Sequence, residues 1–116
     1  SVYLLGVQGA PSNSLIVWKL SGKRFFQVLS MPQFNPVSIA ATTTTGPYIA
    51  VATRHLVGNI HPETIDIYRF KEELPELQLE QRLPTISPKK VLFAELPSGE
   101  SVLYVASDNP ASPLEV

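Results

Sequence analysis

The sequence predicts an all-β fold built from short antiparallel strands. Apolar and polar residues alternate over stretches of about five residues, with turn-forming clusters at roughly ten-residue spacing. Eleven prolines and six glycines are spread along the 116 residues, and they leave little room for helices of ordinary length. Strands of this length and spacing are typical of sheets made from neighbouring hairpins.

Nine segments carry strand signals: 2–7, 15–20, 24–29, 37–41, 48–52, 64–70, 77–81, 91–95 and 102–106. Turn-forming clusters such as SGK at 21–23 separate them. The segment KEELPELQLEQR at 71–82 has a helix-like composition, but Pro75 interrupts it and LQLEQ at 77–81 alternates. We therefore expect a turn followed by a strand there.

Three segments of the first half recur in the second half. LIVWKL at 15–20 matches IDIYRF at 65–70, and MPQFNP at 31–36 matches LPTISP at 83–88. IAVAT at 49–53 matches LYVAS at 103–107. The offset grows from 50 to 52 to 54, and each increase falls in a turn, where length changes are tolerated. The paired prolines of the second match are unusual in generic strands, which favours a repeat over accidental self-similarity.

Partial matches flank these two copies. YLLGV at 3–7 matches IAVAT at 49–53, while Leu114 and Val116 match Ile65 and Ile67. We divide one domain into a part-blade at 1–13, repeats at about 14–63 and 64–113, and the start of another strand at 114–116. Four strands in about fifty residues are the size of a β-propeller blade.

A propeller ring needs about four to eight blades, so we expect this chain to be part of a larger propeller. Two unpaired strand edges would otherwise remain exposed. The alternative is a two-sheet sandwich that is complete in itself, which would fold alone as a monomer.

The blade pattern resembles the EPTP/EAR (epitempin) repeats, and more loosely WD40-like blades. The aromatic-bearing elements read SLIVWKLSGKRFFQVLSMP and TIDIYRFKEELPELQLEQRLP, and the closing elements read GPYIAVATRH and GESVLYVASDN. Lys19 and Arg69 follow the aromatic residues, so the Trp-Asp pair of WD40 blades is absent. The epitempin resemblance implies a non-enzymatic, secreted or cell-surface module that binds protein partners such as receptor ectodomains.

Trp18 and Tyr68 occupy the same position in the two repeats. We expect them to pack between neighbouring blades, because large aromatic side chains dominate core energetics. The alternative is that they are hot spots of a protein interface.

The connections 8–13, 54–63 and 108–113 occupy the same junction in successive units, so they should line one rim. They vary while the flanking strands stay alike, as binding loops on a constant scaffold do. The longest is the predicted protein-contact loop, with six candidate residues: Arg54, His55, Leu56, Asn59, His61 and Glu63.

The two histidines and Glu63 could also be read as a metal site. Gly58 and Pro62 break any strand that would place them on one face, so we expect a solvated loop without a metal. The glutamates at 72, 73, 76 and 80 and the pair Lys89–Lys90 are likewise expected to be solvated.

The sequence contains no catalytic or cofactor motif: G-x-S-x-G, G-x-G-x-x-G and the phosphate-binding loop are all missing. We expect a non-enzyme without a cofactor. The alternative is part of a catalytic propeller whose active-site residues lie mostly on other blades. A net charge of -1 argues against nucleic-acid partners, and the short apolar runs exclude a membrane-spanning helix. The absence of cysteine excludes disulfides and thiolate zinc sites.

Overall fold

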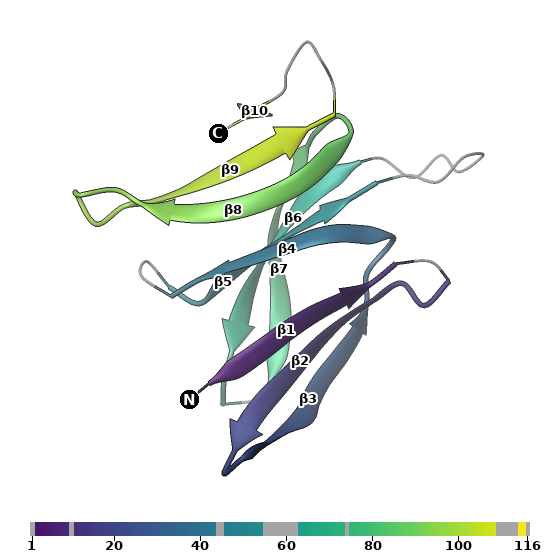
Figure 1. Cartoon of the computed structure of the whole chain (residues 1–116), viewed down its shortest axis with the longest axis vertical. Coiled ribbons are helices and arrows are strands. Elements are labelled where there is room, and N and C mark those ends of the chain that lie inside the picture. Colours follow the sequence, from purple (N-terminus) through teal and green to yellow (C-terminus); the bar gives the residue numbers. More distant parts are fainter. Residues whose placement is uncertain are drawn as a thin grey trace.

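A computed structural model describes residues 2–9, 11–43, 46–54, 63–73 and 75–108, and the backbone of 114–115. The described residues form ten strands and no helix (Figure 1). The strands are β1 (Tyr3–Gln8), β2 (Ser14–Ser21), β3 (Arg24–Pro32), β4 (Pro36–Thr42), β5 (Tyr48–Thr53), β6 (Thr64–Lys71), β7 (Glu76–Pro84), β8 (Pro88–Glu95), β9 (Ser101–Ser107) and β10 (Leu114–Glu115).

The strands form three antiparallel sheets in chain order. The first sheet is β1-β2-β3, the middle sheet is β4-β5-β6-β7, and the third sheet pairs β8 with β9 and β9 with β10. Figure 1 shows the first sheet at the bottom, the middle sheet at the centre and the third sheet at the top. Within each sheet every strand pairs with the next one along the chain, so the sheets are meanders of hairpins.

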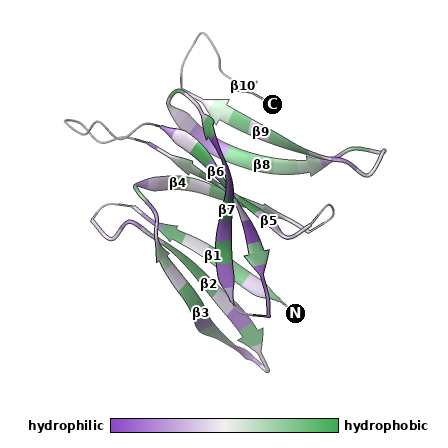
Figure 2. Cartoon of the chain, turned by 180° about the vertical axis from the view of Figure 1, so that it is seen from behind, coloured by the Kyte–Doolittle hydropathy of each residue, from purple (hydrophilic) through white to green (hydrophobic). Residues whose placement is uncertain are grey.

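The all-β class and all nine predicted strands are confirmed. Their ends differ from the predicted ones by a few residues, as in β3, which is Arg24–Pro32 in place of 24–29. The segment with helix-like composition is a turn followed by β7, as expected. Figure 2 shows β7 as mostly hydrophilic, and its side chains are largely exposed because it forms the edge of the middle sheet.

The middle sheet is covered on both faces. One cluster, with Leu15 of β2 and Tyr68 of β6, packs the first sheet against the middle sheet. A second cluster, with Ile65 of β6 and Val91 of β8, packs the middle sheet against the third sheet. β5 contributes Ile49 and Val51 to the first cluster and Ala50 and Ala52 to the second. Since alternate residues of a strand point to opposite faces, a strand buried on both faces reads as a continuous apolar run.

The strand pairing repeats at the offsets seen in the sequence. β2 and β3 have a register shift between Val17 and Trp18, and β6 and β7 have one between Ile67 and Tyr68, fifty residues on. β4 and β5 have a shift after Pro36, and β8 and β9 have one after Pro88. Bulges are specific local features of a ladder. Their recurrence means that the two halves share one backbone plan.

The predicted match of YLLGV with IAVAT is wrong by one residue. It makes Tyr3 equivalent to Ile49, whereas the ladders pair Leu4 with Trp18 and Ile49 with Tyr68. Leu4 is therefore the equivalent of Ile49. A short apolar run carries no marker of register, and a one-residue shift moves every side chain to the opposite face.

The sequence repeat and the sheets are out of phase. The unit 14–63 contains β2 and β3 of the first sheet together with β4 and β5 of the middle sheet. The four-stranded middle sheet runs instead from Pro36 to Pro84. Each sequence unit therefore links two successive sheets.

The outward faces of the first and third sheets carry large apolar side chains. Leu4 and Phe25 on the first sheet are 49% and 45% exposed, and Leu92 on the third sheet is 56% exposed. Leu4 and Phe25 occupy the positions at which Ile49 and Leu77 of the middle sheet contact the first sheet. Leu92 is the equivalent of Ala40, which packs against the third sheet. We call these two surfaces the outer faces.

Candidate protein-binding rim

The described ends of the three connections meet at one end of the sheets, which we call the connection end. The backbone N–H of Asn35 donates to Asn13 Oδ1 at 3.0 Å, and Asn35 Nδ2 donates to the carbonyl oxygen of Arg54 at 2.8 Å. Asn35 has a φ of 27°, a conformation that Asn tolerates better than most residues. Asn35 thus ties the end of the 8–13 connection to the start of the 54–63 connection.

Arg54 joins the second connection to the third. Arg54 Nη1 lies 2.8 Å from Asp108 Oδ2, and Arg54 Nε lies 3.8 Å from Glu63 Oε2. Lys89 Nζ lies 4.0 Å from the other carboxylate oxygen of Asp108. The Arg54 and Asp108 side chains are about one-third and two-fifths exposed, so solvent screens this charge network.

The same backbone contacts recur in the next unit. Asn13 O accepts from the N–H of Gln33 at 2.8 Å, and fifty residues on Glu63 O accepts from the N–H of Thr85 at 3.2 Å. These bonds close the two junctions in the same way. The first two connections therefore end in the same way.

The side chains of Asn13 and Glu63 make equivalent hydrogen bonds at these two junctions. Glu63 Oε1 accepts from the N–H of Ser87 at 2.9 Å, as Asn13 Oδ1 does from the N–H of Asn35. Ser87 has a φ of 46°, so the left-handed conformation also recurs. A carboxylate in one copy and an amide in the other supply the same acceptor.

Two of the six predicted contact residues lie in the part of the chain that the structure describes. Arg54 is partly exposed at the connection end, whereas the Glu63 side chain is 10% exposed and is occupied by Ser87 and Arg54. Glu63 therefore holds the base of the connection. The other four, His55, Leu56, Asn59 and His61, lie outside the described residues. The prediction of a solvated loop without a metal depends on the two histidines and therefore stays a prediction. Within the described residues, no three His, Cys, Asp or Glu side chains are grouped so that they could hold a metal ion.

Tyr68 and Trp18 lie on equivalent faces of two successive sheets. Tyr68 is 3% exposed and packs with Leu15 of the first sheet in the cluster between the two sheets. Trp18 lies on the outer face of the first sheet, across Gly6: a Cβ added at Gly6 would come within 2.9 Å of the Trp18 ring. Trp18 is half-buried.

A buried polar cluster joins the connection between β3 and β4 to the middle sheet, and the sequence analysis missed it. Asp66, 3% exposed in β6, accepts from Gln33 Nε2 at 3.0 Å and from Thr64 Oγ1 at 2.8 Å. Arg82 Nε lies 3.3 Å from Asp66 Oδ1, and Tyr68 OH donates to Gln33 Oε1. The signal in the sequence was a carboxylate inside the apolar run TIDIYRF. A buried carboxylate is costly unless it is paired and hydrogen-bonded, as it is here.

The environment of Tyr68 favours its neutral form. Burial raises the pKa of Tyr68 to about 12, and the nearby Asp66 carboxylate acts in the same direction, while Arg82 opposes the shift. A small hollow of about 140 Å³ lies beside this cluster, lined by Phe34 and Pro32 as well as by the polar side chains. Every side chain of the cluster has a partner, so its geometry is that of a structural bridge.

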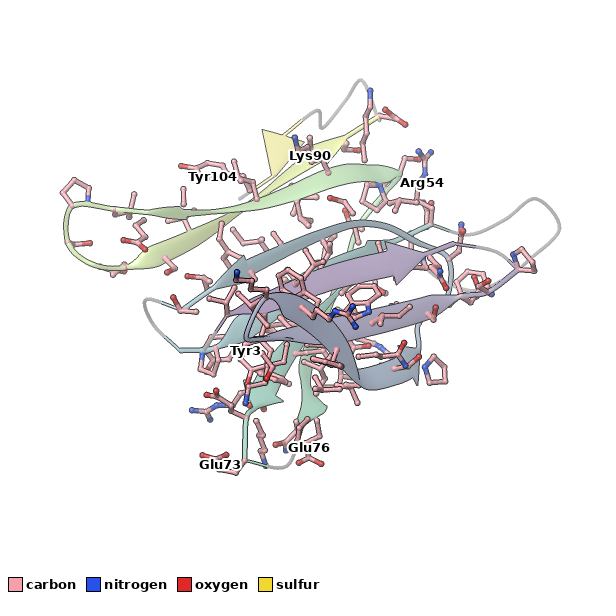
Figure 3. The ribbon with its side chains drawn as sticks, turned by 60° about the horizontal axis from the view of Figure 1, so that its bottom comes forward. Tyr3, Arg54, Glu73, Glu76, Lys90 and Tyr104 are labelled. Carbon is pink, nitrogen blue, oxygen red and sulfur yellow. The ribbon has the colours of Figure 1, made fainter. Side chains whose placement is uncertain are left out.

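The acidic turn between β6 and β7 lies far from the connection end. Figure 3 shows Glu73 and Glu76 projecting at the opposite end of the molecule from Arg54. Both are exposed, and Glu76 Oε1 lies 3.8 Å from Lys71 Nζ. Lys89 and Lys90 are exposed as well. These four charged side chains are exposed, as expected.

Comparison with known proteins gave no match: no family model, no curated protein and no solved structure is significantly similar to this chain. Among the described residues, no helix has the length and apolar character needed to cross a membrane.

Proposed function

We propose that this chain is a segment of a β-propeller that binds a protein partner and catalyses no reaction. The observation that carries the proposal is the recurring plan of the three sheets. The middle sheet has four antiparallel strands in chain order, which is the composition of a propeller blade. Its neighbours reproduce the same bulges and the same junction bonds at regular offsets.

The outer faces support a longer array of sheets. Each outer face carries apolar side chains at positions that are packed at the two internal junctions. Sheets that follow one another around a ring would cover both faces, as neighbouring repeats do in repeat proteins. The remaining blades of the same propeller are therefore the first partners of this segment.

The connection end is the surface proposed for an outside partner. The junction bonds around Asn13, Asn35 and Glu63 hold the bases of the connections on a regular frame. Loops that differ in length on such a frame are a common basis of recognition. The epitempin resemblance points to a receptor ectodomain as the partner and to an extracellular location.

The buried carboxylate favours this function over the catalytic alternative. A catalytic acid or base must reach a substrate proton. Asp66 instead is nearly inaccessible and is engaged by Gln33, Thr64 and Arg82. Its arrangement suits a structural role, in which Asp66 holds the connection between β3 and β4 against the middle sheet.

The test is binding of the full chain, immobilised, to a panel of purified receptor ectodomains. One variant replaces residues 55–62 with a Gly-Ser segment of equal length and keeps Arg54 and Glu63. The matched control replaces the β8–β9 turn at 96–100, which lies at the other end of the sheets. We expect the first replacement to abolish capture of an ectodomain and the control to preserve it. Capture of no ectodomain by the unaltered chain, or equal capture by both variants, would contradict the proposal.

A further inference from the structure

An apolar hollow opens between the first and middle sheets at the end opposite the connections, which we call the hairpin end. Its volume is about 180 Å³. The lining side chains used below are Tyr3, Val17, Ala41, Tyr48, Ile49 and Phe70. The hollow is continuous with the cluster of Leu15, Ile49, Val51 and Tyr68 that packs these two sheets together. It is the unfilled end of an established interface.

The repeat explains why this end is unfilled. Ala41 of β4 pairs with Ile49, and its equivalent in the third sheet, Phe93 of β8, pairs with Leu103. Phe93 packs against the cluster between the middle and third sheets, together with Leu103 and Ile67. The equivalents of Leu103 and Ile67 at the first junction are Ile49 and Val17, and both line the hollow. The hollow is thus the space that a benzyl side chain fills at the next junction.

The lining suits an aromatic ring. The Tyr3 and Phe70 rings meet edge to face, with centroids 4.9 Å apart, and a third ring can join such a pair edge-on or offset. Figure 3 shows Tyr3 among the side chains at this end of the molecule. Tyr3 OH is engaged by Glu72 Oε1 at 2.8 Å. An apolar cavity of roughly 150 Å³ is large enough to bind benzene.

We infer that this hollow receives a phenylalanine side chain of a protein partner. The inference rests on the proposed protein-binding function, and it adds a second contact surface at the hairpin end. The ring would take the place at Ala41 that Phe93 takes at the following junction. Partner binding would then complete the packing of the first junction, which the chain leaves open by carrying alanine at this position.

The first experiment titrates the full chain with N-acetyl-phenylalaninamide and follows backbone amide signals by NMR. We expect saturable shifts confined to the neighbourhood of Ala41 and Ile49, with a dissociation constant on the order of 1 mM for so small a ligand. N-acetyl-leucinamide and N-acetyl-alaninamide should bind more weakly. Equal binding of the leucine probe, or no saturable shift with the phenylalanine probe, would overturn the inference.

Two substitutions test the site from within the chain. Ala41→Phe should fill the hollow and weaken binding of the phenylalanine probe by roughly tenfold or more, because the new ring occupies the same space. Val37→Phe is the matched control: it adds a ring to the same strand at an exposed position outside the hollow, and binding should not change. Phe93→Ala should open an equivalent hollow, so that a second set of shifts appears around Leu103. Unchanged probe binding by Ala41→Phe would refute the site.

Ectodomain binding by the Ala41→Phe and Val37→Phe variants separates this inference from the proposed function. An ectodomain captured through residues 55–62 should also bind more weakly to Ala41→Phe than to Val37→Phe. If Ala41→Phe loses the probe but keeps full ectodomain binding, the hollow is not a partner site, while the proposed function stands. If no ectodomain binds the unaltered chain, the proposed function and the assignment to a protein partner both fail.

Discussion

Asp66 is the side chain whose loss should weaken the described residues most. Substitution by Ala leaves the buried side chains of Gln33 and Thr64 without the carboxylate that accepts from them, so Asp66→Ala should lower the free energy of unfolding by about 3 kcal/mol. Asp108→Ala is the control, because Asp108 is 44% exposed and its ion pairs are worth about 0–1 kcal/mol. Urea unfolding of both variants measures the difference. Equal losses would refute the structural role of Asp66.

The phenol of Tyr68 predicts a loss of stability at alkaline pH. Its pKa of about 12 in the folded chain exceeds the usual value of about 10 in the unfolded chain, so the unfolded chain releases the proton first. Stability is therefore unaffected below pH 10 and falls by about 2–3 kcal/mol as the pH rises from 10 to 12. Urea unfolding across this range measures the fall. Tyr68→Phe should remove it, and Tyr104→Phe should leave it in place.

The sequence predicted the contacts of individual side chains less well than it predicted the positions of the strands. The equivalence of Trp18 and Tyr68 was visible, but the partner of Asp66 was not, because Gln33 lies in the connection between β3 and β4, 33 residues before Asp66, and reaches it only through the fold. The role of Glu63 was missed for a similar reason. A carboxylate in a loop suggests solvation or recognition, whereas here it accepts from the backbone N–H of Ser87.

At the scale of elements, the two faces of β8 test the stacking of the sheets. Phe93 packs into the second junction and its neighbour Leu92 lies on the outer face. Phe93→Ala should lower the free energy of unfolding by about 2–3 kcal/mol, less than the roughly 3–5 kcal/mol for a fully buried Phe, because this side chain is only half-buried. Leu92→Ala should cost about 0.5 kcal/mol or less. Thermal and urea unfolding of the two variants compare them, and a larger loss for Leu92→Ala would reverse the assignment of faces.

The strands were predictable because alternation and turn chemistry are local signals. Gly22, with a φ of +64°, lies in the turn that the cluster SGK indicated, and Gly99, with a φ of +89°, lies in the turn between β8 and β9. The extra residues at the ends of β3 and β8 include Pro32 and Pro88, which propensity alone would leave outside a strand. The register of β1 depends on its partner β2, and the short run YLLGV could not determine it.

At the scale of the whole molecule, the repeat in the sequence predicted that the three sheets share one plan but not how the units map onto sheets. The offsets of 50, 52 and 54 reappear in the bulges and in the junction bonds. The boundaries differ, since the four-stranded middle sheet runs from Pro36 to Pro84 whereas the sequence unit runs from 14 to 63. Periodicity fixes the length of a unit, whereas the position of the sheet boundary depends on which strands pair.

The outer faces predict association of the isolated chain. Exposed apolar patches and open strand edges favour contact between copies. The outer face of the third sheet can pack on the outer face of the first sheet of another copy in the way the sheets pack internally. Such a contact is heterologous and can extend. Leu4→Asp places a charge on one outer face, and it should lower the association without unfolding the chain, since Leu4 is 49% exposed.

The mass of the chain in solution as a function of concentration, measured by light scattering, tests most directly the central claim that these sheets are successive members of a longer array. The account predicts a mass that rises above the 12.7 kDa of one chain as the concentration increases, and a smaller rise for Leu4→Asp. A constant mass of 12.7 kDa at every concentration, with a single cooperative unfolding transition, would contradict it and would favour a sandwich that is complete in itself.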